Sequence, residues 1–173
     1  MSFHMRRTDR QITDPEMLGR VLKATQYVTL AMSMRDQPYL VSLSHGYDGE
    51  RNCLYFHCGK VGKKLEYLKA NNRVWGQAVL DFGYTGECHH RYASVQFSGE
   101  VSFLEEQEEK LRAMACMMRQ LDKEPEPLIA DLTPKKLESM LVGKVDIDYI
   151  TGWHNQGQTP AERQEEFDRL FKK

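Results

Sequence analysis

The segment 55–64 contains the residue types that a phosphate-binding site needs. A strand-like alternation ends near Cys58, and the residue period then changes from two to 3.6, which predicts a helix within 59–72. The first turn of a helix has unpaired N–H groups and a partial positive charge, so it attracts anions. Gly59 and Gly62 would let a ligand approach the backbone closely. Three lysines lie at the same place: Lys60, Lys63 and Lys64.

Lysines are disfavoured in the first turn of a helix because they repel its positive end. Their clustering there predicts a bound anion such as a phosphate. A solvated basic helix face is the alternative interpretation. The segment is not a Walker loop, because the pattern G-x-x-x-x-G-K-[ST] is absent.

His57 is the residue of this segment that could transfer protons. In the alternating strand 53–58, Leu54 and Phe56 share one face, and His57 lies on the other. If Leu54 and Phe56 fill a core, His57 faces outward beside the anion site. An imidazole titrates near neutral pH and can donate or accept a proton. A hydrogen-bonded surface histidine is the alternative interpretation.

Several serines lie on strand faces turned away from the apolar residues. In the alternating segment 38–45, Val41 and Leu43 share one face, and Ser42 and Ser44 lie on the other. Ser94 has a similar position in the predicted strand 91–103. Their hydroxyl groups could bind the polar edge of a ring, although serines on outward faces are common.

The sequence Cys88-His89-His90 suggests a metal site, since thiolate and imidazole groups bind zinc or copper. However, the cluster has no second paired motif, and we predict no metal. The chain has four cysteines without C-x-x-C spacing, which is typical of reduced thiols in a cytoplasmic protein.

Composition excludes several classes of protein. With 173 residues, the chain is long enough for one domain with a hydrophobic core. Its formal net charge of −1 gives no overall positive potential that would attract nucleic acid. It lacks a run of 18 apolar residues and the apolar stretch of a secretory signal. We therefore expect a cytoplasmic protein without nucleic-acid or membrane partners.

The residue patterns predict a sheet with peripheral helices. A helix is expected within 13–26, another within 105–121, a short one from Thr133 and a terminal one from Thr159. The segment 82–90 is predicted to be a loop. Tight turns between consecutive strands favour an antiparallel barrel over a doubly wound parallel sheet. The predicted strands are 27–34, 38–45, 53–58, 73–81, 91–103 and 144–150.

A series of short motifs occurs in an order that resembles a known family. The series begins with M-R-R-T-D-R-Q-I-T-D at 5–14 and ends with I-T-G at 150–152. Together the motifs resemble the FMN-binding split-barrel proteins related to pyridoxamine 5′-phosphate oxidase, most closely the nitroimidazole-resistance (Nim) group. The other motifs are P-Y-L-V-S-L at 38–43, G-Y at 46–47, L-Y-F-H at 54–57, G-K-K-L at 62–65, and R-Y-A-S-V at 91–95 with the following Gly99.

This resemblance implies a mainly β, six- to seven-stranded antiparallel split barrel with peripheral helices. It also implies a homodimer with FMN at the interface. Lys63 and Lys64, in the same motif as Gly62, match the basic pair that contacts the FMN phosphate. Ser94 matches a polar residue near the ring. The residues that match strands running beside the flavin are Val41, Ser42, Leu43, Ser44, Phe56 and His57.

Departures from the family pattern concern the substrate more than the flavin. Ser42 replaces the usual proline, and Trp153 stands where lysine is common. The residues that bind pyridoxamine phosphate in the true oxidases are not recognisable, so we do not predict vitamin B6 synthesis. We place an FMN-binding domain at 1–152 and a C-terminal extension with a terminal helix at 153–173.

The resemblance predicts an FMN-dependent oxidoreductase that reduces a small planar acceptor, either nitroaromatic or quinone-like. In Nim-type proteins the histidine matched by His57 is proposed to help reduce the substrate, so His57 is the catalytic candidate. A non-catalytic flavin-binding or flavin-sensing protein is one alternative. A haem-binding protein on the same barrel is another, with His57, His89, His90 and His154 as candidate axial ligands.

Overall fold

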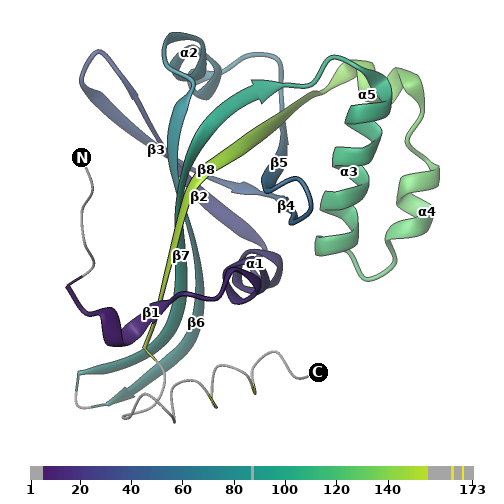
Figure 1. Ribbon diagram of the computed structural model, residues 1–173. Coiled ribbons are helices and arrows are strands. Elements are labelled where there is room, and N and C mark those ends of the chain that lie inside the picture. Colours follow the sequence, from purple (N-terminus) through teal and green to yellow (C-terminus); the bar gives the residue numbers. More distant parts are fainter. Residues whose placement is uncertain (1–5, 87, 156–164, 166–168, 170–173) are drawn as a thin grey trace.

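A strongly curved antiparallel sheet forms the framework of the protein (Figure 1). The computed structural model describes residues 6–86, 88–155, 165 and 169. Hydrogen bonding gives the strand order β3-β2-β6-β7-β8-β5-β4, and β1 pairs with β8. The strands are β1 (Gln11–Ile12), β2 (Tyr27–Met34), β3 (Gln37–Ser44), β4 (Gly46–Asp48), β5 (Cys53–Cys58), β6 (Arg73–Gly86), β7 (His89–Phe103) and β8 (Leu141–Asn155).

The curvature of the sheet brings strands from distant positions in this order together. β3 contacts β5, although four strands separate them along the hydrogen-bonded path. The predicted antiparallel split barrel is therefore confirmed. The described chain has eight strands rather than six or seven, because β1 and β4 contain only two and three residues and are too short to show an alternating pattern.

Helix α1 (Pro15–Ala24) follows the local signals in the sequence. The side chain of Asp14 accepts a hydrogen bond from the Glu16 N–H, and Pro15 occupies the first turn. The apolar stripe faces the barrel core, where Val21 and Leu22 are fully buried. The helix predicted within 13–26 is confirmed.

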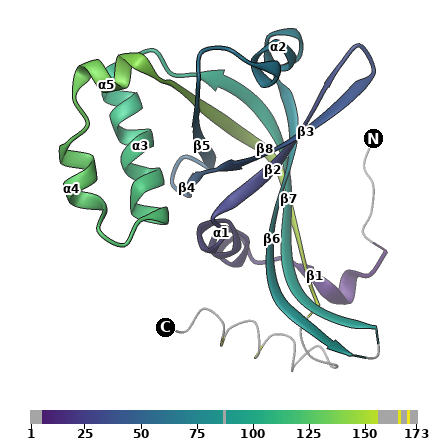
Figure 2. The same cartoon turned by 180° about the vertical axis from the view of Figure 1, so that it is seen from behind.

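Three helices between β7 and β8 form a lobe beside the barrel. They are α3 (Gln107–Leu121), α4 (Pro125–Ala130) and α5 (Pro134–Ser139), and we call them the helical lobe (Figures 1 and 2). Helix α2 (Lys63–Ala70) lies apart from the lobe, in the connection between β5 and β6. None of the helices in the described part of the chain is long and apolar enough to cross a membrane.

Strand β5 is shared by two apolar clusters. Leu54 and Phe56 belong to the barrel core, which also contains residues of α1, β2, β6 and β7. Cys53 and Tyr55 point the other way and pack against the helical lobe, with Met114 as a partner. Both faces of β5 are therefore buried along most of its length.

His45 joins the helical lobe to the barrel. Its Nε2 lies 2.9 Å from the Leu22 carbonyl oxygen and 3.2 Å from Nε2 of Gln120. The Gln120 side-chain nitrogen donates hydrogen bonds of 3.1 Å to the carbonyl oxygens of both Leu22 and Thr25. The Leu22 carbonyl can only accept, so in the Nε2–H tautomer His45 donates to it. Burial lowers the pKa of His45, which favours the neutral ring in this tie.

Strands β6, β7 and β8 are longer than predicted, and the loop prediction for 82–90 is wrong. β6 continues to Gly86, and β7 begins at His89. The register shifts twice between Asp81 and Gly86, and Gly83 and Gly86 have φ of +90° and +95°. These bulges keep a Gly-rich, turn-like sequence within a hairpin.

The C-terminal end of the sheet also differs from the prediction. β8 runs to Asn155, so the boundary placed at Gly152 falls inside this strand. The terminal helix predicted from Thr159 lies outside the described residues, apart from Glu165 and Arg169, which are helical.

Candidate functional site

The N-terminus of α2 has the geometry of an anion site. Gly62 is the N-cap with φ 139° and ψ 164°, and no side chain caps the helix. The N–H groups of Lys63 and Lys64 precede the first intrahelical hydrogen bonds, which run from Leu65 and Glu66 to the Gly62 carbonyl. A Cβ built on Gly59 or Gly62 would meet nothing within 4 Å. The space beside the α-carbons of Gly59 and Gly62 is therefore open.

The lysines of this turn lie against aromatic rings. The Lys63 Nζ is 4.5 Å from the centre of the Tyr39 ring and 5.5 Å from that of Tyr67. The Lys64 Nζ is 5.5 Å from the centre of the Phe56 ring. Among the described residues, neither lysine forms an ion pair with a carboxylate. Two uncompensated positive charges therefore lie where α2, β3 and β5 meet.

Tyr39 was not predicted as a site residue. It lies on the inward face of β3 and its ring is 5.1 Å from that of Tyr67 of α2. The P-Y motif at 38–39 was the available signal, because it precedes a strand predicted to run beside the ligand.

The predicted β3 residues divide between the two faces of the strand. Val41 and Leu43 are half-buried and pack against the barrel core. Ser42 and Ser44 are exposed on the outer face, and the Ser42 hydroxyl lies 3.1 Å from that of Thr29. A ligand on one side of β3 could contact only one of these pairs through side chains.

Phe56 and His57 likewise lie on opposite faces of β5. Phe56 is buried in the barrel core near Lys64, whereas the side chain of His57 is exposed. His57 shares its face with Cys53 and Tyr55, which are covered by the helical lobe. The structure therefore brings Phe56, Lys63 and Lys64 together and places His57 on the other side of the strand.

Ser94 lies in a separate pocket of about 310 Å³ on the outer face of the sheet. We call it the Ser94 pocket. It is uncharged, with hydroxyl and amide groups beside aromatic rings. The indole Nε1 of Trp153 is buried and has no hydrogen-bond partner among the described residues. The residues that line the pocket are Gln77, Val79, Tyr92, Ser94, Gln96, Thr151, Gly152 and Trp153.

The outer face around this pocket carries large exposed apolar side chains. Trp75 and Tyr149 form an edge-to-face pair with their ring centres 5.8 Å apart, and both are exposed. Tyr27, Leu40 and Val79 are also exposed. Between these residues runs a polar row of register partners across five strands: Ser42, Thr29, Gln77, Gln96 and Thr151.

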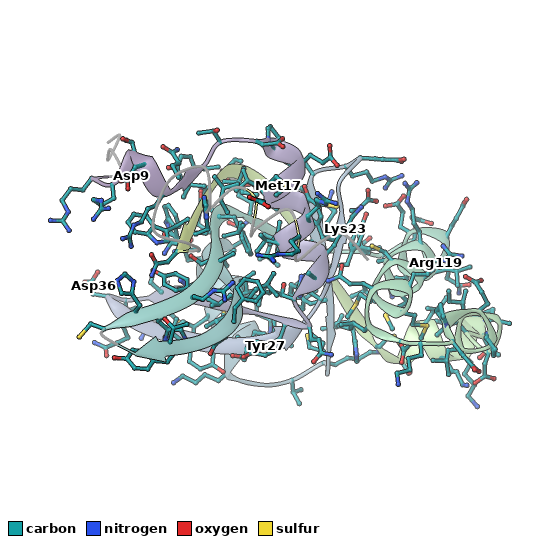
Figure 3. All side chains as sticks on the ribbon, turned by 90° about the horizontal axis from the view of Figure 1, so that it is seen from below. Asp9, Met17, Lys23, Tyr27, Asp36 and Arg119 are labelled. Atoms are coloured by element: carbon teal, nitrogen blue, oxygen red, sulfur yellow. The ribbon has the colours of Figure 1, made fainter. Side chains whose placement is uncertain are left out.

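A larger, more open pocket of about 830 Å³ lies between α1, β4 and the helical lobe. Lys23 and Arg119 line it from α1 and α3 (Figure 3). Arg119 is paired with Glu126 at 2.9 Å, so part of the positive charge is neutralised. Burial, and then the charge of Asp48, raise the pKa of Cys116 in this pocket to about 11, so its thiol is not an activated nucleophile.

The described residues contain no group of three or more His, Cys, Asp or Glu side chains that could hold a metal ion. In the described part of the chain, Cys58 and Cys88 belong to separate elements, β5 and the β6–β7 hairpin.

Comparison with solved structures finds proteins of the same fold. A protein from Bacteroides thetaiotaomicron named for 5-nitroimidazole antibiotic resistance has 27% identity over 82% of this chain and 84% of its own, with a TM-score of 0.72. An FAD-binding protein from Mesorhizobium loti has 25% identity over 84% and 96%, with a TM-score of 0.62. A flavocytochrome from Azotobacter vinelandii, at 15% identity over 98% and 79%, has a TM-score of 0.73 and shares the fold.

No curated protein matches the chain. The family model described as pyridoxamine 5′-phosphate oxidase matches residues 14–154. This range includes α1, the first turn of α2 with Lys63 and Lys64, which we call the lysine turn, the Ser94 pocket and nearly all of β8. The chain therefore belongs to the pyridoxamine 5′-phosphate oxidase-like family, whose structural relatives include flavin-binding proteins.

Proposed function

We propose that the protein is an FMN-dependent oxidoreductase that reduces a small planar acceptor, nitroaromatic or quinone-like. The observation that carries this proposal is the uncapped N-terminus of α2, where Lys63 and Lys64 have no carboxylate partner among the described residues. An uncompensated pair of ammonium groups beside free N–H donors is suited to a phosphate dianion. The relative named for nitroimidazole resistance supports the class of acceptor.

The residues at the start of α2 fit the phosphate group of FMN. Lys63 and Lys64 would hold the phosphate, and the open space at Gly59 and Gly62 admits it. When bound, FMN supplies the two-electron redox chemistry, and the protein supplies binding and orientation. His57 is the proposed proton donor; its exposure would let it contact a molecule outside the barrel.

We also propose that the working unit is a homodimer formed through the outer face of the sheet. This face exposes Trp75, Tyr149, Leu40 and Tyr27, and contiguous exposed apolar groups mark interaction sites. The α2 turn and the β6–β7 hairpin lie at opposite ends of the sheet (Figures 1 and 2). A dimer formed through this face would place the Ser94 pocket at the interface.

Replacing Trp75 with glutamate should therefore convert a dimer into monomers, because it buries a charge in the interface. Sedimentation velocity at micromolar protein measures the change. Leu128→Glu is the matched control, since Leu128 is exposed on α4 in the helical lobe, away from this face. If W75E sediments like L128E, the interface lies elsewhere.

The absorption spectrum of the untreated protein, followed by mass identification of the released ligand, tests the cofactor. FMN is expected. If the released ligand is FAD, the predicted cofactor is wrong but the protein is still a flavoprotein. An intense Soret band would support the haem-binding alternative.

Anaerobic reoxidation of the reduced flavoprotein tests the activity. Nitroaromatic or quinone acceptors should reoxidise the bound flavin much faster than they reoxidise free FMN. Tight flavin retention with no acceleration for any acceptor would instead identify a flavin-binding or flavin-sensing protein.

A further inference from the structure

His45 lies at the corner between β3 and β4, where the barrel meets the helical lobe. Its side chain is fully buried. Its Nε2 lies 2.9 Å from the Leu22 carbonyl oxygen of α1 and 3.2 Å from the Gln120 side-chain nitrogen of α3. The Nδ1 atom is buried as well and has no hydrogen-bond partner among the described residues. The ring is therefore held through one of its two nitrogens only.

The side chain of Gln120 extends these contacts from α3 to α1 and β4. Its nitrogen donates to the carbonyl oxygens of Leu22 and Thr25, which lie at the C-terminal end of α1. Its oxygen accepts the backbone N–H of Tyr47 in β4 at 2.9 Å. We call the contacts of His45 and Gln120 the His45 tie. It joins α1, the β3–β4 corner and the helical lobe at one point.

The His45 tie has no place for a protonated ring. A protonated imidazole carries hydrogens on both nitrogens. The hydrogen on Nε2 can bond to the Leu22 carbonyl, but the hydrogen on Nδ1 meets neither solvent nor a protein acceptor among the described residues. This is true whichever nitrogen carries the hydrogen in the neutral ring. A Cβ on the adjacent Gly46 would lie 2.7 Å from the backbone nitrogen of Met117, so the corner and α3 are in direct contact.

Among the described residues, no charged side chain offsets the cost of a charged ring. Burial lowers the pKa of His45, and the hydrogen bond to the Leu22 carbonyl opposes this shift. Strand β3 contains no charged residue. The charged groups of α1, the β4 segment and α3 that line the 830 Å³ pocket together with Gln120 are not among the causes of the shift. These are Lys23, Asp48, Glu50, Arg112 and Arg119, and the pocket also contains the weak acids Tyr47 and Cys116.

We propose that His45 is a pH-sensitive switch that determines how firmly the helical lobe is held against the barrel. Protonation of the ring breaks the His45 tie, and the β3–β4 corner separates from α3. The apolar cluster that contains Cys53, Tyr55 and Met114 still joins α3 to β5. Protonation therefore increases the population of an opened lobe and leaves the barrel folded. This inference does not rest on the proposed function.

The direction of the pH dependence follows from the lowered pKa. A solvated histidine has a pKa of about 6.5, so below about pH 6.5 His45 binds a proton in the opened state but not in the closed state. Opening is then coupled to proton uptake, and its equilibrium constant rises about tenfold for each unit of pH. The tie contributes its full stability above about pH 6.5 and loses it as the pH falls toward the lowered pKa of the closed state.

Hydrogen exchange of the untreated, full-length protein, followed by mass spectrometry, measures this opening. After correction for the intrinsic exchange rate, protection of α3 and of the corner 45–48 should fall about tenfold per pH unit below about pH 6.5. Protection of β6 and β7 should stay the same. His45→Gln should abolish the pH dependence, because a glutamine side chain keeps an N–H donor for the Leu22 carbonyl and does not titrate.

His89→Gln is the matched control, because His89 is exposed in β7. It should keep the pH dependence of the wild type. Protection of α3 that does not change with pH, or that falls equally in H45Q and the wild type, overturns the inference. An equal loss of protection in β6 and β7 also overturns it, since that result means global unfolding.

A measurement on the wild type serves if H45Q does not fold. Nitrogen-15 NMR should show a neutral His45 ring in the closed protein at about pH 6, where a solvated histidine is mostly protonated. A His45 ring that is mostly protonated at this pH while α3 keeps its full protection contradicts the proposal.

Discussion

Replacing Lys63 and Lys64 together with alanine should weaken FMN binding about 100-fold or more and leave riboflavin binding nearly unchanged. Each charged hydrogen bond to a phosphate contributes about 1.5–3 kcal/mol, and riboflavin has no phosphate. Both ammonium groups lie over aromatic rings without a carboxylate partner among the described residues, so their removal leaves no buried anion behind. Titration of the apoprotein with each ligand, followed by flavin fluorescence, measures the two affinities.

Lys69→Ala is the matched control for this experiment. Lys69 lies in the last turn of the same helix and pairs with Glu66 at 3.5 Å, far from the N-terminal donors. Its replacement should change neither affinity. Equal losses of FMN and riboflavin in the double variant would mean that the lysines support the fold rather than the phosphate.

Replacing Gly143 with alanine should destabilise the fold by about 1–3 kcal/mol, the usual cost of overpacking a core. Gly143 is the β8 register partner of Phe56, and an added Cβ would overlap the Phe56 ring. That ring is 2% exposed and packs edge-on against Phe103, so it has no free space to move into. Urea unfolding of the apoprotein measures the effect.

Gly59→Ala is the matched control for stability, because a Cβ there meets nothing within 4 Å. We expect a change within about 0.5 kcal/mol. G143A should also weaken FMN binding, since a displaced Phe56 ring disturbs the contact with Lys64. A G143A variant as stable as the wild type would show that β8 separates from β5 at little cost.

Local signals were sufficient to predict much of the fold. The Asp14 cap and the apolar stripe after it predicted α1, and the alternation in 53–58 predicted β5 to the residue. The lysine turn was also visible, because the period changes from two to 3.6 at Gly59. Each of these features is determined by residues that are close together in the sequence.

Features that depend on distant partners could not be predicted in the same way. β1 and β4 exist because β8 and β5 supply their hydrogen bonds. The hairpin at 82–90 looked like a loop because its glycines serve bulges rather than a turn. The tie formed by His45 and Gln120 joins residues 75 positions apart, and no sequence period reveals such a pair.

The charged residues of the candidate site were predicted from the sequence, but the way its side chains pack together was not. Lys63 and Lys64 were identified by type and position, whereas Tyr39, which contacts Lys63, was found only from the packing of β3 against α2. The placement of Ser94 in a pocket separate from the lysines was not visible either. It depends on the curvature of a seven-strand path, which is a property of the whole sheet.

The double burial of β5 has a thermodynamic consequence. A strand covered on both faces cannot shift without disturbing two packed clusters at once, and β5 leads directly into the turn before α2. Displacing β5 would therefore cost packing in the barrel core and in the helical lobe together. The double packing fixes the start of the connection that leads to Lys63 and Lys64 from both sides of the sheet.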